Sequence, residues 1–245
     1  MGKKLRLDKY LADMKEGSRQ EVKKRIKKGE VSVNEQMIKL PEYKVDPDLD
    51  RIEVNGREVL YHQFEYWMLY KPAGCVCATE DKKEKTVMEY LPEDSRKDLF
   101  PVGRLDKDTE GLLLLTNDGA LAHALLSPKK HVDKTYYADI AGVVGEEDRE
   151  AFLNGLDIGD EKKTLPAKLI ICSVSEKEEK STILVTIQEG RYHQVKRMFE
   201  AVGKKVVFLK RLSMGNLKLD ETLSPGMARR LTRKELEQLS GTQKE

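Results

Sequence analysis

The feature that most constrains the fold is a run of four leucines, Leu112–Leu115. The run follows a charged loop and is followed by the turn residues Asn117, Asp118 and Gly119. An apolar run of this length between turn signals is typical of a buried strand. The preceding loop contains Arg104, Asp106, Lys107 and Asp108. The sequence therefore predicts that a charged loop lies at one end of a buried strand.

The segments around this run do not alternate strictly between strand and helix. Strand patterns occur at 66–70, 135–140, 169–172, 182–187, 206–209 and 216–219, and helix patterns follow residue 119 and occupy 148–156 and 191–202. Strict alternation would favour a doubly wound parallel sheet, whereas this order favours an α+β fold on a mixed or antiparallel sheet.

The N-terminal part of the chain has a different pattern. Apolar residues at helical spacing predict a helix over 7–15, and Ser18 with Glu21 forms a capping-box signal for a second helix that Gly29 ends. Short strands are expected at 31–33 and 51–54. We therefore predict a small domain over 1–58, a linker over 59–65 and a larger domain over 66–240.

Charge is distributed unevenly along a chain whose formal net charge is only +2. Residues 1–28 carry eleven Lys or Arg against four Asp or Glu, and residues 191–211 carry seven against one. A solvated charged face is the ordinary explanation of such a patch, but two local patches on a nearly neutral chain indicate an anionic ligand.

Membrane and metal functions are not indicated. No segment is long and apolar enough to span a bilayer, so no membrane partner is expected. Three cysteines cannot form a disulfide framework, which makes the cytosol the expected compartment. Cys75 and Cys77 lack a second ligand pair at metal spacing, so we expect no metal site.

The loop and the leucine run together resemble a known catalytic motif. Gly103-Arg104-Leu105-Asp106, followed by Thr109 and Gly111–Leu115, is similar to the motif of the pseudouridine synthases related to RsuA and RluA. Without that resemblance, the loop would be interpreted as a surface turn with local ion pairs. The resemblance implies that Asp106 is the catalytic carboxylate.

Three other segments agree with this family. Lys134-Thr135-Tyr136 resembles its K-x-Y motif and implies that Tyr136 is the active-site tyrosine. Residues 188–198 resemble its E-G-x-x-H-Q-V-K/R-R-M motif and imply that Lys196 is the cation beside Asp106. Residues 208–211 resemble the segment whose leucine, here Leu209, closes the uracil pocket. The substrate-binding residues that the resemblance implies are Arg104, Leu209, Arg191, His193 and Gln194.

The first domain resembles the S4 RNA-binding domain, through residues 6–11, Ser18-Arg19 and residues 29–34. An S4 domain ahead of a synthase domain, together with the segment 219–232, is typical of the RsuA-type branch. Within this domain the predicted RNA-binding residues are Arg6, Lys9, Arg19, Lys23, Lys24, Lys27 and Lys28.

The chemistry of pseudouridine formation fits these residue types. The N1–C1′ bond breaks, the uracil turns, C5 joins C1′ and the C5 proton leaves, so the reaction is redox-neutral and no cofactor is expected. A carboxylate can attack or stabilise the electron-poor carbon, and a neighbouring cation keeps it ionised. The target base must leave its helix, and the family implies that Arg104 fills the vacated space.

We therefore expect an enzyme that isomerises a uridine of 16S ribosomal RNA, either free or within a small-subunit assembly intermediate, and that acts as a monomer. A synthase for 23S ribosomal RNA and a catalytically inactive S4-type RNA-binding protein are the alternatives. A hydrolase using Asp106 and Asp108 is disfavoured, because residues two apart on an extended loop are expected to point apart.

Overall fold

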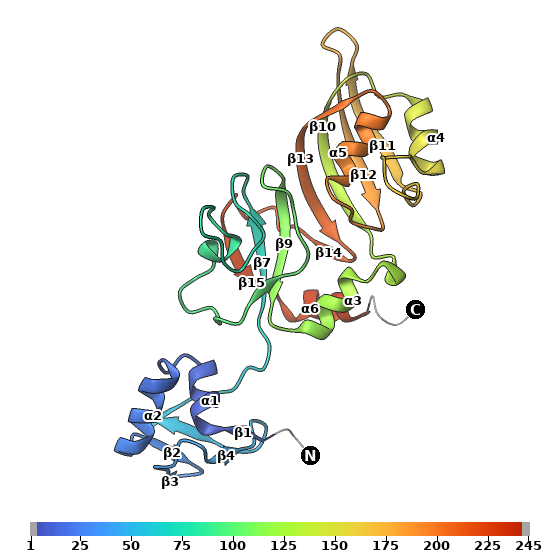
Figure 1. Ribbon diagram of the computed structural model, residues 1–245. Helices are drawn as coiled ribbons and strands as arrows, with labels where there is room; N and C mark the ends of the chain where they lie inside the picture. The colour runs from blue at the N-terminus through green and yellow to red at the C-terminus, as the bar shows by residue number, and fades with distance from the viewer. Residues whose placement is uncertain (1–3, 242–245) are drawn as a thin grey trace. The chain divides into compact units, whose positions relative to one another are not determined.

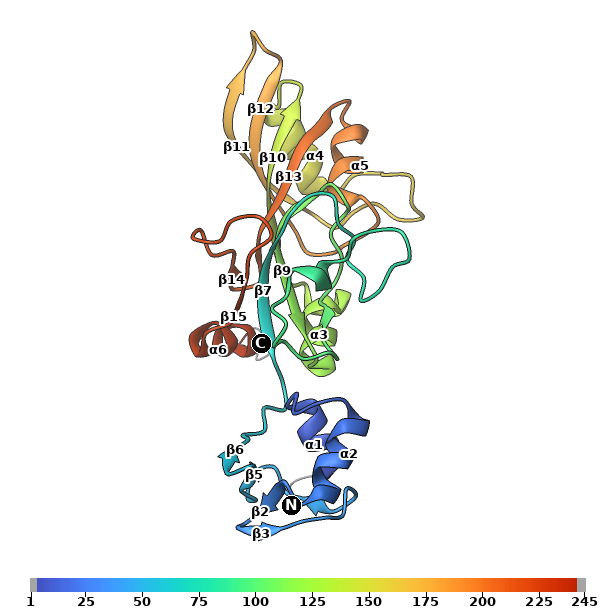
Figure 2. The same cartoon turned by 90° about the vertical axis from the view of Figure 1, so that its left-hand side faces the viewer.

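The computed structural model describes residues 4–241, which form two compact units (Figures 1 and 2). The first unit contains residues 4–65 and 93–99, and the second contains 66–92 and 100–241. The segment 93–99 thus returns to the first unit from within the larger predicted domain. In the described part of the chain, no helix is long and apolar enough to cross a membrane.

The first unit packs two helices against short strands. Ser18 caps α2 as the sequence predicts: its Oγ accepts a hydrogen bond from the Glu21 amide, and the Glu21 carboxylate accepts one from the Ser18 amide. Gly29 ends this helix at φ 79°. The apolar faces of both helices meet the strands in one core. The elements are β1 (Leu5–Arg6), α1 (Leu7–Asp13), α2 (Arg19–Lys28), β2 (Val31–Val33), β3 (Gln36–Met37), β4 (Lys44–Val45), β5 (Ile52–Val54) and β6 (Arg57–Glu58).

The second unit is built on a mixed sheet of nine strands among the described residues. Its main order is β11-β12-β10-β13-β9-β7-β15, and the pairing of β13 with β9 is parallel while the other pairings are antiparallel. This confirms the predicted α+β class. The strands are β7 (Tyr66–Lys71), β8 (Phe100–Pro101), β9 (Glu110–Thr116), β10 (Lys134–Ala141), β11 (Lys168–Ser175), β12 (Lys180–Ile187), β13 (Lys205–Met214), β14 (Leu217–Lys218) and β15 (Ala228–Arg230).

Helices cover the sheet in two groups. α4 (Glu146–Asn154) and α5 (Gln194–Ala201) lie on the same face of strands β10 to β13 (Figures 1 and 2). Their rings Phe152 and Phe199 pack 4.9 Å apart in a core with the inward residues of β12. α3 (Gly119–Leu126) and α6 (Arg233–Gly241) pack in a second core with β7 and β9. Two short 3-10 helices span Val87–Tyr90 and Pro128–Lys130.

Gly111 permits the parallel contact at the centre of the sheet. It has φ 104°, and a Cβ atom built on it would lie 2.2 Å from the carbonyl oxygen of Arg211. Any side chain at this position would therefore separate β9 from β13. This close approach fixes β13 beside the charged loop that precedes β9.

Candidate active site

A buried lysine holds the loop that carries Asp106. Lys71 is fully buried at the end of β7, and its Nζ donates hydrogen bonds to the carbonyls of Thr109 (2.9 Å), Pro72 (3.0 Å) and Lys107 (3.3 Å). Burial lowers the pKa of Lys71. The Cys77 thiol also accepts a hydrogen bond from the Leu105 amide. These contacts fix the backbone on both sides of Asp106.

The side chains that contact the Asp106 carboxylate come from α5 and from the residue before it. The Nζ of Lys196 lies 3.3 Å from its Oδ2, and the Nε2 of His193 lies 3.6 Å from its Oδ1. The cations nearest in sequence are placed elsewhere, since Lys107 pairs with Glu84 at 2.7 Å. The Arg104 side chain lines the pocket described below, and it makes no ion pair within residues 4–241.

Asp108 is a second carboxylate at the same amine. Its Oδ1 lies 2.6 Å from Lys196 Nζ, closer than Asp106, and its side chain is 72% exposed. The expectation that Asp106 and Asp108 point apart is therefore wrong, because both approach one Nζ from the same loop. The hydrogen bond from Lys196 lowers the pKa of Asp108. Burial acts to lower the pKa of Lys196, but its two carboxylate partners raise it overall.

The carboxylate opens onto a cavity of about 960 Å³ within the second unit. Tyr136 and Leu209 both line it and both are buried. Tyr137 lies on the other face of β10, where its hydroxyl donates to Asp139, as strand alternation predicts. One cavity therefore brings together a carboxylate, a tyrosine ring and an apolar wall, a combination of apolar lining and few polar groups that is typical of a ligand site.

Two buried cations also line this cavity. Lys134 donates to the carbonyl of Val132, and Arg211 donates through Nε to the carbonyl of Leu112 at 2.8 Å. Burial, and then the charge of Arg211, lowers the pKa of Lys134. The Nη2 atom of Arg211 is buried without a hydrogen-bond partner in the described chain. The cavity is therefore lined by positive charge from Lys134 and Arg211, while Lys196 reaches the site through its contact with Asp106.

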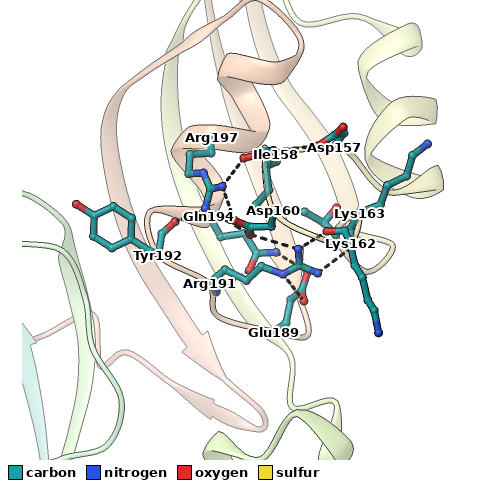
Figure 3. Close-up of polar contacts among 12 residues, drawn as sticks. Asp157, Ile158, Asp160, Lys162, Lys163, Glu189, Arg191, Tyr192, Gln194 and Arg197 are labelled. Carbon is teal, nitrogen blue, oxygen red and sulfur yellow. Dashed lines mark hydrogen bonds and ion pairs between the residues drawn. The ribbon is translucent and has the colours of Figure 1, made fainter.

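Arg191 and Gln194, predicted as substrate-binding residues, line the cavity but use their polar groups to hold the loop before α5 (Figure 3). The Arg191 guanidinium bonds to Glu189 (3.0 Å) and to the carbonyls of Lys162 (2.6 Å) and Lys163 (2.7 Å). Gln194 donates to Glu189 and accepts from the Arg191 amide, both at 2.9 Å. Arg191 and Gln194 therefore hold the loop that forms one wall of the cavity. Direct contact of either side chain with the substrate stays a prediction.

The predicted RNA-binding residues fall into two sets. In the first set, the fully buried Asp8 carboxylate forms ion pairs with Arg6 (2.8 Å), Arg19 (3.6 Å) and Lys23 (4.0 Å). Lys9 pairs with Asp13 at 3.2 Å. The remaining cations are exposed on α2 and have no ion-pair partner among residues 4–241: Lys24, Lys27 and Lys28.

Several residues of the site were not predicted from the sequence. Asp108 and Lys134 lie inside the matched motifs, which assign them no role, and Lys71 directly follows the strand expected over 66–70. The signal for Lys71 was a lysine at the end of a strong apolar strand, where a buried amine needs nearby carbonyls. Arg211 had no such signal, because an alternating strand does not show which of its cations is buried.

Comparisons with known proteins agree with this geometry. Residues 65–201 match the family profile described as RNA pseudouridylate synthase, and residues 5–50 match the S4 domain. A Bacillus subtilis protein named RNA pseudouridine synthase YtzG is 48% identical, covering 98% of this chain and all of its own. The ribosomal small subunit pseudouridine synthase A of Vibrio vulnificus is 44% identical, covering 95% of this chain and 98% of its own.

Two further relatives extend the comparison. The ribosomal large subunit pseudouridine synthase B of Bacillus subtilis is 41% identical, covering 96% of this chain and 95% of its own. A solved structure titled as a pseudouridylate synthase is 38% identical with a TM-score of 0.67, covering 96% of this chain and 99% of that one. With the family profile over more than half of its length and such relatives along nearly all of it, the chain belongs to the RNA pseudouridine synthases and carries an S4 domain ahead of the catalytic domain.

Proposed function

We propose that this protein converts a uridine of small-subunit (16S) ribosomal RNA to pseudouridine, with Asp106 as the catalytic carboxylate. The observation that carries the proposal is that Asp106, which pairs with Lys196, lines the same cavity as Tyr136 and Leu209. The pair places a carboxylate and a cation together where a flipped base would enter. The name of the Vibrio vulnificus relative supports the small subunit as the target.

We assign roles to four other residues from their positions around Asp106 and the cavity. Lys196 holds the charge of Asp106, Tyr136 presents its ring to the base, and Leu209 closes the pocket. Arg104 lies beside the cavity without an ion-pair partner among residues 4–241, and it occupies the space that the flipped base leaves. Each assigned residue of the site comes from one chain, so we propose that a monomer is sufficient. A role in ribosomal RNA modification implies the cytosol as compartment.

The large-subunit (23S) ribosomal RNA is the second candidate target, because one relative that covers nearly the whole chain is named for that subunit. The experiment is tritium release from unmodified 16S and 23S transcripts labelled at uridine C5, each offered free and within a partly assembled subunit. We expect release from the 16S substrate. Release from 23S RNA alone would move the proposal to the large subunit, and release from neither would refute it.

A further inference from the structure

An exposed aromatic ring stands directly beside the candidate active site and has no role in the chemistry assigned above. The rings of Tyr192 and His193 are stacked, with centroids 3.8 Å apart and planes inclined by 18°. His193 in turn lies 3.6 Å from Asp106, and both rings line the cavity. The outer ring, Tyr192, is 73% exposed.

The backbone beneath this pair is held firmly. His193 precedes α5 in the left-handed region at φ 48°, and its carbonyl accepts the Arg197 amide. The Arg197 guanidinium donates to the Tyr192 carbonyl at 3.1 Å and to Asp160 at 2.6 Å. Figure 3 shows the Tyr192 ring directed away from this polar cluster. These contacts fix the backbone that carries the ring, which lowers the conformational entropy lost when the segment binds a ligand.

Protein packing does not account for the exposed ring. Its stacked neighbour covers one face, while the large exposed area leaves the rest open to solvent. Tyr192 lines the cavity, and tyrosine is enriched at binding interfaces, where its ring packs and its hydroxyl stays in contact with water. Proteins that bind unpaired RNA stack bases on such rings, and the contact tolerates any base because every base has an aromatic face.

We infer that Tyr192 is a stacking platform for the unpaired base of a nucleotide next to the target uridine. The inference rests on the proposed function, because it takes RNA as the ligand and Asp106 as the reaction centre. Even with Arg104 in the space that the target base leaves, a neighbouring base that is splayed out of unpaired RNA loses its own stacking partner. The open face of Tyr192 replaces that partner, and His193 continues the stack toward Asp106.

The direct test uses fluorescence of the full-length Tyr192→Trp variant. It is titrated with oligouridylate and with an abasic ribose-phosphate oligomer of equal length, at one ionic strength so that phosphate contacts contribute equally. We expect quenching by oligouridylate and none by the abasic oligomer. The control is Val207→Trp, which places the reporter at a residue of β13 that is 69% exposed and outside the cavity lining. This control should not be quenched by either oligomer.

A second measurement uses affinity for unmodified 16S transcript. Tyr192→Ala should weaken binding by about 5- to 150-fold, the usual range for one stacked base, and Tyr192→Phe should restore it. Equal quenching by the abasic oligomer, absence of quenching by oligouridylate, or unchanged affinity of the alanine variant would overturn the platform. Tritium release by the unaltered enzyme separates the two proposals: active enzyme with no quenching refutes only the platform, whereas quenching without release refutes only the proposed target.

Discussion

The Nζ of Lys196 lies 3.3 Å from Oδ2 of Asp106, so the carboxylate receives its cation from α5 and not from the flanking Arg104 or Lys107. The parallel pairing of β9 with β13 places the Asp106 loop beside β13, and α5 packs against the same core. The fold, and not the local sequence, therefore determines the electrostatics of this carboxylate.

Replacing Lys196 tests this pair. Lys196→Met removes the cation beside Asp106, and we expect single-turnover rates to fall by about 10²-fold or more, the scale for losing one preorganised charged donor in a site. Lys196→Arg keeps the charge and should retain most activity, although its geometry differs. Methionine and arginine variants with equal rates would show that the charge is not what matters.

Asp108 should affect the pKa of Lys196 more than the rate. Its hydrogen bond is the main contribution that raises the pKa of Lys196, so in Asp108→Asn the amine should lose its proton at lower pH than in the unaltered protein. The measurement is the pH dependence of Lys196 acetylation, followed by mass spectrometry. Because Asp108 is 72% exposed, we expect the rate at neutral pH to fall less than about fivefold. An unchanged acetylation profile would contradict the pairing.

Lys71→Met should weaken the second unit and the catalytic loop together. It removes the donor to the buried Thr109 carbonyl, and an orphaned buried acceptor costs roughly 1–3 kcal/mol. Urea unfolding monitored on the full chain should show this loss, accompanied by lower activity. Lys82→Met, an exposed lysine of the same unit, is the matched control. A Lys71 variant as stable and active as this control would refute the supporting role.

The free lysines of α2 should contribute to RNA binding through phosphate contacts. Each neutralised phosphate adds about −0.7 to −0.9 to the slope of log K against log salt. Changing Lys24, Lys27 and Lys28 to Gln should therefore make the slope shallower, by an amount matching up to three contacts. Equal slopes for variant and parent would mean that this face of α2 does not touch RNA. Point variants are preferable to deleting residues 1–58, which would remove Asp13 from the largely buried Arg96.

Local signals predicted the parts of the fold that depend on neighbours in sequence. The capping box at Ser18 and the glycine at the end of α2 were both confirmed. The helix expected to begin near 191 begins at Gln194, because His193 adopts a left-handed conformation and the Gln194 side chain takes the Arg191 amide. The last helix, α6, was missed, although Thr232 and Glu235 form a reciprocal capping pair that the sequence contains.

Other features depend on contacts between distant segments. The strand expected over 206–209 extends to Met214 because β10 and β9 pair along it, and the polar residues Lys210 and Arg211 hid that extension. Residues 93–99 return to the first unit through Arg96, which contacts Asp13 and the carbonyl of His62. Neither the extension of β13 nor the return of residues 93–99 produces a periodic pattern in the sequence.

The most direct test of the central claim is tritium release from C5-labelled 16S transcript by the Asp106→Asn variant. Asparagine has nearly the same shape but cannot carry the charge, so the cavity and the RNA affinity should remain while turnover disappears. Binding of the same transcript is measured in parallel, and urea unfolding of the variant shows that the second unit is folded. We predict release below a hundredth of the parent rate with affinity largely retained. Retention of even a tenth of the parent rate would show that Asp106 is not the catalytic carboxylate.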